Sequence, residues 1–274
     1  MARNIGQAML GVIGAAVSLA ACERPAPTVA PGADPETAPS VGQEPASSPP
    51  VLARAELLSA VAAAASDAAG GVARTGPSGL GGRQFRLKIA FGCLGEDAPP
   101  PGLDPVRDGV ARWSRAADRG NLRLSLSPAD WSDGDPSGSP PAGFDGVEGV
   151  WIPHPWMMGE GCPAPGLPMT DERVAKIGPR VGLAMLRAEG ASRLGRAGSG
   201  DFSYRVRGQD GAPAPADGYR LVIEGRLTAW ADGRVIRCRV IWADEPPACV
   251  IGAAVDRIAF EDAAGVRLSE WRPG

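Results

Sequence analysis

The chain contains one histidine, so any imidazole chemistry must use His154. This residue lies in the segment Trp-Ile-Pro-His-Pro-Trp at 151–156, where a proline on each side restricts the backbone. A Ser–His–Asp hydrolase needs a carboxylate next to the imidazole, and Asp145 or Glu148 is close enough in sequence to supply one. The sequence has neither a GxSxG motif nor a glycine-rich phosphate loop between a strand and a helix. We therefore assign no catalytic residue.

The two tryptophans of this segment are the most distinctive binding candidates. The chain has seven tryptophans but only two tyrosines. An exposed indole beside a proline turn can stack on a sugar ring or accept an apolar side chain of a protein partner. The alternative is that these indoles pack the segment onto the core, in a domain with few other aromatic residues. We take Trp151, His154 and Trp156 as the candidate binding site.

Four cysteines lie beyond residue 50: Cys93, Cys162, Cys238 and Cys249. An even number in an exported chain favours two disulfides. Of the three possible connectivities we favour Cys238–Cys249 with Cys93–Cys162, because the first pair falls on neighbouring predicted strands. A metal site is the alternative, but the cysteines lack CxxC spacing and the chain has a single histidine. A Cys162–His154 nucleophile pair would need a free thiol. We predict no metal and no cofactor.

The elements that must position these residues are mainly strands. Alternating apolar and polar residues predict strands at 85–91, 110–116, 122–126, 147–152, 181–187, 202–207, 219–230, 235–242, 249–260 and 266–271. Asp232-Gly233 predicts a hairpin turn, and residues 128–146 predict a loop. One alanine-rich helix is predicted at 51–69, after Ser48-Pro49-Pro50 and before Gly70-Gly71. The predicted fold is mainly β, an antiparallel sandwich or open barrel with one N-terminal helix.

The N-terminus has the layout of an export signal. Arg3 is followed by uncharged residues 5–21, which are rich in Gly and Ala and suit a signal peptide better than a membrane-spanning helix. The sequence Leu-Ala-Ala-Cys at 19–22 resembles the lipobox of bacterial lipoproteins. That resemblance implies that residues 1–21 are removed and that Cys22 carries fatty acyl chains, which anchor the protein to a membrane. Glu23, in place of the aspartate associated with inner-membrane retention, implies the outer membrane, facing the periplasm.

The rest of the chain divides into a tether and one domain. Residues 22–50 contain eight prolines and few large apolar side chains, a composition that predicts an unfolded tether, which the lipobox resemblance implies is lipidated at Cys22. Residues 51–274 are long enough for a single domain with its own core. Removal of residues 1–21 takes away Arg3 alone among the charged residues, which leaves 27 basic and 31 acidic side chains. This balance argues against a nucleic-acid partner.

The domain also shares structural motifs with other exported proteins. These motifs are Phe-Gly-Cys at 91–93, Trp-Ile-Pro at 151–153 ahead of Cys-Pro at 162–163, and a C-terminal meander that ends in Trp271. Through these motifs, residues 83–271 resemble uncharacterised exported proteins of alphaproteobacteria. The resemblance implies a β-rich fold and no particular activity. The sequence thus predicts a non-enzymatic lipoprotein of the cell envelope that binds an envelope protein or a glycan. It does not indicate an oligomeric state. The alternative is a hydrolase of envelope polymers, glycan or ester, that uses His154 or a carboxylate pair.

Overall fold

The computed structural model describes residues 49–72, 79–93, 95, 107–115, 121–132, 140–163, 180–190, 201–206, 217–241 and 243–272. These ranges belong to one compact unit, Ser48–Gly274. The predicted signal peptide, the lipid-bearing Cys22 and the tether up to residue 48 lie outside the described residues. Within the described ranges, no helix has the length and apolarity needed to cross a lipid bilayer.

The helix α1 (Arg54–Ala69) begins three residues later than the sequence predicted. Leu52 is extended instead and forms a parallel bridge with Phe85, which buries the leucine side chain. The helix starts where the Glu56 carboxylate accepts a hydrogen bond from the Ala53 N–H at 3.1 Å. Glutamate in the first turn also suits the positive end of the helix dipole.

The helix ends at the Gly70-Gly71 pair, as predicted, and Gly71 has a φ of 69°, a conformation that favours glycine. Its buried apolar side chains recur at helical spacing: Leu57, Leu58, Val61 and Ala65. All four enter the main core, so the helix is firmly packed against the sheet.

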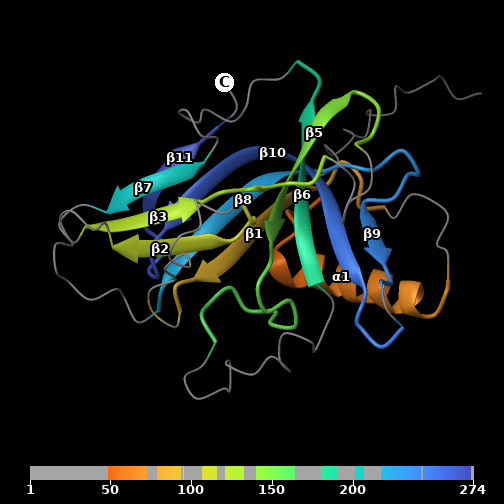
Figure 1. The fold of residues 1–274 in the computed structure, drawn as a ribbon, viewed down its shortest axis with the longest axis horizontal. Helices are drawn as coiled ribbons and strands as arrows, with labels where there is room; N and C mark the ends of the chain where they lie inside the picture. Colours follow the sequence, from red (N-terminus) through yellow and green to blue (C-terminus); the bar gives the residue numbers. More distant parts are fainter. Residues whose placement is uncertain are drawn as a thin grey trace, which may run out of the picture. The chain divides into compact units, whose positions relative to one another are not determined.

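The described residues form two sheets (Figure 1), which confirms the mainly β class. The larger has the strand order β1-β8-β10-β6-β5-β4, with β9 and β11 also paired to β10. Its strands are β1 (Gln84–Phe91), β4 (Ala129–Asp130), β5 (Phe144–Trp151), β6 (Arg180–Ala188), β8 (Tyr219–Leu227), β9 (Ile236–Arg239), β10 (Ala248–Glu261) and β11 (Arg267–Trp271). The sheet is not closed into a barrel, and it is not wholly antiparallel, because β6 and β10 pair in parallel.

Strand β10 is shared by two sets of neighbours. Its first half, Ala248–Ala253, pairs with β6, and four residues of that half also pair with β9. Its second half pairs with β8 and β11. The register to β8 shifts between Val255 and Arg257, so Asp256 forms a bulge. A bulge bends a strand and increases its twist, which allows β10 to serve both halves of the sheet.

The hairpin predicted at Asp232-Gly233 is only partly correct. The turn is present, since the Gly233 N–H donates to the Trp230 carbonyl at 2.8 Å. However, β8 and β9 do not form the predicted pair, because β8 is held by β1 on one side and β10 on the other. Strand β9 pairs with β10 instead and is shorter than the predicted strand at 235–242. The predicted loop at 128–146 is also wrong in part, because it contains β4 and the first residues of β5.

The smaller sheet has the order β2-β3-β7 and is antiparallel. It consists of β2 (Ala111–Arg115), β3 (Leu122–Leu126) and β7 (Phe202–Val206). Its apolar side chains join those of α1 and of one face of the large sheet in a single cluster. The main core therefore lies between that face of the large sheet and both the helix and the small sheet.

The opposite face of the large sheet has an apolar cluster around Trp131. The ring of Trp131 meets that of Trp151 edge-on, with ring centroids 4.9 Å apart. A Cβ atom added to Gly149 on β5 or to Gly182 on β6 would overlap the Trp131 ring. These glycines therefore make room for the indole to lie on the sheet. Buried members of this cluster are Ala129, Trp131, Val147, Ala184, Leu186, Trp230 and Val250.

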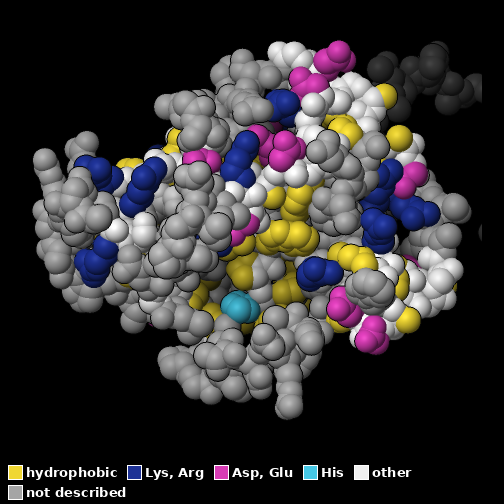
Figure 2. All heavy atoms as spheres, viewed as in Figure 1, with side chains coloured by type: hydrophobic (Ala, Val, Ile, Leu, Met, Phe, Trp, Pro, Cys, Tyr) yellow, Lys and Arg dark blue, Asp and Glu magenta, His cyan; other side chains and the backbone are white. Residues whose placement is uncertain are grey.

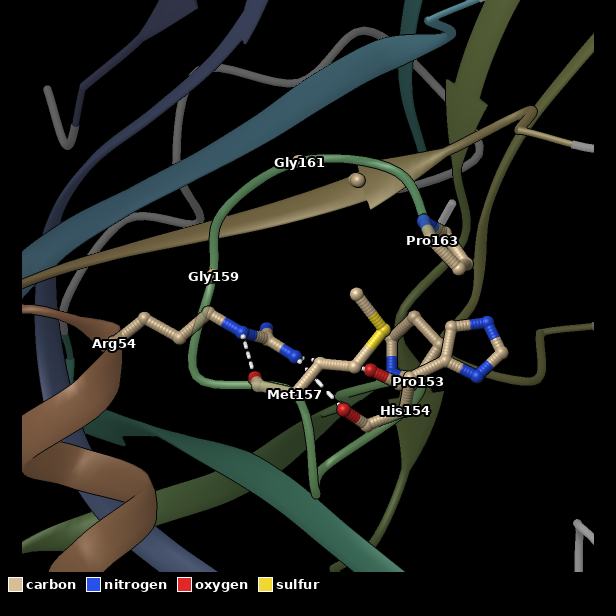
Figure 3. Close-up of a pocket in the computed structure, with 8 residues that line it drawn as sticks. Arg54, Pro153, His154, Met157, Gly159, Gly161 and Pro163 are labelled. Carbon is tan, nitrogen blue, oxygen red and sulfur yellow. Dashed lines mark hydrogen bonds between the residues drawn. The ribbon is translucent and has the colours of Figure 1, made fainter. Parts of the chain in front are cut away.

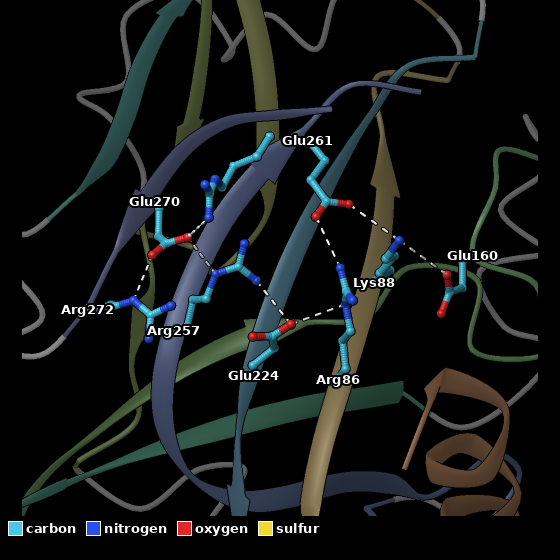
Figure 4. Close-up of polar contacts among 9 residues, drawn as sticks. Arg86, Lys88, Glu160, Glu224, Arg257, Glu261, Glu270 and Arg272 are labelled. Carbon is cyan, nitrogen blue, oxygen red and sulfur yellow. Dashed lines mark hydrogen bonds and ion pairs between the residues drawn. The ribbon is translucent and has the colours of Figure 1, made fainter. Parts of the chain in front are cut away.

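A network of ion pairs covers the other end of the same face (Figure 4). Strand alternation puts its side chains opposite the core residues of β1, β8, β10 and β11. Glu261, only 5 % exposed, pairs with Arg86 at 3.3 Å and Lys88 at 3.4 Å. Glu224 forms ion pairs with Arg86 at 3.2 Å and with Arg257 at 3.0 Å. Glu270 forms ion pairs with Arg257, Arg267 and Arg272 at 2.7–2.8 Å. The network joins the four strands through their charged side chains.

Glu270 should make this network sensitive to acid. The hydrogen bonds from Arg257 and then Arg272 lower the pKa of Glu270 from 4.5 to about 2. A carboxylate whose pKa is lowered by folding stabilises the fold above its unfolded pKa, and this contribution disappears as the pH falls through the folded value. We expect the difference in urea unfolding midpoint between the native chain and Glu270→Gln to shrink as the pH falls from about 5 to about 2.

The exposed Glu189 is the control, because its side chain makes no hydrogen bond or ion pair with the residues that the structure describes. Glu189→Gln should leave the midpoint close to the native one across the same pH range. A pH-independent difference for Glu270→Gln would contradict the prediction.

Two cysteine pairs lie at disulfide distance, in the connectivity that the sequence favoured. Cys93 and Cys162 have Cα atoms 5.4 Å apart, and Cys238 and Cys249 have Cα atoms 4.0 Å apart. The second pair consists of directly opposed residues on β9 and β10. The first joins the segment just after β1 to the segment that follows β5.

Candidate functional site

The chain makes a tight turn immediately after β5. The Met157 N–H donates to the His154 carbonyl at 2.9 Å, so Pro155 and Trp156 occupy the two central positions of a β-turn. Proline suits the first of these positions because its φ is already fixed. His154 has a φ of 51°, the only positive φ of a non-glycine residue in the described ranges. We call residues 153–158 the Trp156 turn.

The Trp156 turn presents large apolar side chains to solvent. Trp156 is 43 % exposed and Met158 is 44 % exposed. The rings of His154 and Trp156 lie edge-on, with centroids 5.3 Å apart. The imidazole therefore supports the indole from one side, and the turn holds both rings in place.

Arg54, the first residue of α1, fastens the Trp156 turn to the sheet (Figure 3). Its side chain is buried, and the residue is 4 % exposed. Its guanidinium donates to the carbonyls of Met157 at 3.0 Å, Pro153 at 3.1 Å and His154 at 3.2 Å. It also donates to the Lys88 carbonyl on β1 at 3.3 Å. One side chain thus joins the turn, the helix and the sheet.

The chain beyond the turn is held at a second place. Cys162 forms its disulfide with Cys93 just after β1, and its Sγ lies 3.0 Å from the Asp217 carbonyl. Between the two anchors, Glu160 pairs with Lys88 at 3.8 Å. The backbone that carries Trp156 is therefore fixed on both sides, by a buried cation and by a covalent bond.

A small cavity lies between this segment and α1. It holds about 10 Å³, which is room for one water-sized group. Burial lowers the pKa of His154, and the nearby positive charge of Arg54 lowers it further. Both effects favour the neutral imidazole. The residues that line the cavity are Arg54, Ala90, Pro153, His154, Met157, Gly159, Gly161 and Pro163.

The structure brings together two of the three candidate binding residues. His154 and Trp156 form the ring pair of the turn, whereas Trp151 makes its ring contact with Trp131 on the outer face of the sheet. Trp151 thus follows the alternative weighed above, in which an indole packs the segment onto the sheet. Trp156 is the indole that the turn exposes.

The acids considered as partners of His154 are engaged elsewhere. Asp145 pairs with Arg187 at 2.7 Å, and Glu148 pairs with Arg107 at 3.8 Å. The charged side chain that lines the cavity with His154 is the guanidinium of Arg54. This environment disfavours the imidazolium form that a general base must adopt. Within the described ranges, no three His, Cys, Asp or Glu side chains gather as a metal site would require.

Sequence reasoning missed Arg54, although a signal was present. The apolar face of the helix runs through Leu57, Leu58 and Val61, and residue 54 stands at the same spacing one turn earlier. An arginine on the buried face of a short helix requires buried acceptors. Those acceptors are carbonyls about 100 residues away in sequence, so no local pattern could reveal them.

The chain's one histidine is the single cyan side chain in Figure 2, where hydrophobic side chains lie next to it. This view agrees with a site that combines a few polar groups with apolar surroundings, as binding sites commonly do. Comparison of the chain with protein-family models, with curated proteins and with solved structures found no significant match.

Proposed function

We propose that this protein is a lipid-anchored, non-enzymatic binding module of the bacterial cell envelope, and that the Trp156 turn is its contact surface. The partner is a glycan or a protein of the envelope. The observation that carries the proposal is the exposure of Trp156 on a backbone clamped at both ends. A rigid, exposed indole loses little conformational entropy on binding and supplies a large apolar contact.

Two further observations support binding over hydrolysis. The neighbour of His154 in the cavity is cationic Arg54, which opposes proton uptake by the imidazole. In addition, the cavity admits only one water-sized group, so a ligand must lie mainly on the surface around Trp156. Surface contact of this kind is typical of recognition.

The anchor and the location belong to the same proposal. The Leu-Ala-Ala-Cys sequence at 19–22 supports lipidation of Cys22, and the two disulfides suit an oxidising compartment such as the periplasm. We expect intact-mass analysis of the protein purified from its own host to show a chain that begins at Cys22 and carries acyl chains. A mass that still includes residues 1–21 would contradict the anchor.

The contact surface can be tested by photo-cross-linking in cells. A photo-reactive amino acid with an aromatic side chain replaces Trp156 in the full chain, so that a ring remains at this position, and a second strain carries the same amino acid at Val266. Val266 is a suitable control because it is 58 % exposed and lies in the turn between β10 and β11. We expect a specific glycan or protein adduct from position 156 and none from position 266. Equal labelling at both positions, or none at 156, would contradict the proposed surface.

A further inference from the structure

We infer that the cavity beside Arg54 receives a carboxylate group and that the ligand of the Trp156 turn is an acidic sugar. This inference rests on the function proposed above and names the class of ligand. It follows from the charge of Arg54, from the backbone that faces the cavity, and from the size of the cavity.

Arg54 is a buried cation without an ion-pair partner among the described residues. Its four acceptors are all backbone carbonyls, which satisfy its hydrogen bonds but carry no net charge. Four of its five N–H groups are used, so one N–H on Nη1 has no acceptor in the described part of the chain. Burial lowers the pKa of Arg54, and the carboxylate of Glu160, which itself pairs with Lys88 at 3.8 Å, opposes this shift only in part. A buried charge of this kind favours a bound anion.

The rest of the cavity also suits an anion. Gly159 and Gly161 line it, and neither of their N–H groups has an acceptor among the described residues. A guanidinium nitrogen of Arg220 lies 3.7 Å from the position of a Cβ on Gly161, which adds positive charge nearby. Arg54 and Arg220 thus lie beside the segment, whereas the third cation, Lys88, pairs with both Glu160 and Glu261. Backbone N–H groups beside cations are a common way to bind carboxylates.

The size of the cavity indicates what the remainder of the ligand must be. A space of about 10 Å³ admits an oxygen of the carboxylate but not the sugar ring to which the carboxylate is attached. The ring must lie outside, next to the rings of His154 and Trp156. A flat, exposed indole is a surface on which a pyranose ring stacks. A peptide C-terminus also carries a carboxylate, but its side chains would need their own pockets.

The single histidine provides a direct measurement. A negative charge bound next to His154 stabilises the imidazolium and so raises its pKa. The probes are glucuronate, the neutral sugar glucose, acetate, and an acetylated dipeptide with a free C-terminus. They are added to the chain from residue 22, purified with Cys22→Ser. We expect the imidazole NMR signal to report a higher pKa with glucuronate and, at higher concentration, with acetate, but not with glucose.

Two variants of Gly159 distinguish an effect on anion binding in the cavity from an effect on folding. A Cβ on Gly159 meets no atom within 4 Å, and its φ is not positive, so a side chain is tolerated there. Gly159→Asp puts a negative charge beside the cavity and should weaken glucuronate binding about tenfold or more. Gly159→Ala should change it less than about twofold. Trp156→Ala should weaken glucuronate binding but leave the effect of acetate unchanged, since acetate has no ring to stack.

Any result that differs from these expectations overturns the inference. If no carboxylate raises the pKa of His154, or if Gly159→Asp binds as well as Gly159→Ala, the cavity does not bind anions. If glucose acts like glucuronate, or if the dipeptide binds more tightly than glucuronate, the ligand is not an acidic sugar. A cross-link at position 156 in cells without any carboxylate effect would leave the proposed function intact and reject this inference alone.

Discussion

Replacement of both Cys93 and Cys162 by alanine is expected to lower the free energy of unfolding by about 4 kcal/mol. The reason is that this disulfide closes a loop with a sequence separation of 69, and a cross-link over a long loop removes much conformational entropy from the unfolded chain. Urea denaturation of the purified chain measures the effect. The same variant should also be cleaved faster by proteases at residues 157–163, because one of their two anchors is lost.

The second disulfide provides the comparison. Cys238 and Cys249 are separated by 11 residues, so the same change at this pair should cost less, about 3 kcal/mol. It should leave cleavage near the Trp156 turn unchanged, because this pair joins β9 to β10. Equal protease sensitivity of the two double variants would show that the Cys93–Cys162 bond does not hold the turn.

Replacement of Arg54 by alanine is expected to destabilise the domain by about 3 kcal/mol. The change removes four hydrogen bonds from a charged group and leaves the carbonyls of Pro153, His154, Met157 and Lys88 without their donor. It also detaches the Trp156 turn from α1. Urea denaturation gives the loss of stability, and the NMR signal of His154 reports on the turn.

Arg226 is the matched control. It is exposed near the end of β8, and its side chain has no ion pair or hydrogen bond with the described residues. Arg226→Ala should therefore change the free energy of unfolding by less than about 0.5 kcal/mol. If Arg54→Ala were equally mild, water would have replaced the guanidinium, and the turn would not depend on it.

The strands were predictable because one physical signal defines them. The alternation Phe85, Leu87, Ile89 and Phe91 marks a strand with one buried face, and the structure has β1 at that place. The same signal predicted the strands that the structure has as β2 and β3, and the C-terminal strands. Helix α1 was predictable from its alanine content and the glycine pair at its end. However, Leu52, which was predicted to be helical, forms a β-bridge with Phe85.

Strand partners were less predictable, since pairing depends on distant residues. The predicted hairpin at Asp232-Gly233 needs β8 to pair with β9. No residue near this turn indicates that β8 pairs with β1 instead. The parallel pair of β6 with β10 joins residues 68 positions apart in sequence, for which local pattern carries no information. The site shows the same division. The proline-flanked turn with Trp156 was visible in the sequence, whereas its partner Arg54 was not.

The position of Leu52 and Arg54 has a mechanical consequence. Any tension carried by the chain before residue 49 enters the domain at Leu52, whose backbone bonds to Gln84 and Arg86 are 2.9 and 2.8 Å long. Because Leu52 runs parallel to β1, a pull along the strand loads both bonds in shear at once rather than peeling them apart. The next load-bearing contact is Arg54. Force on this end of the domain therefore acts first on β1 and then, through Arg54, on the Trp156 turn.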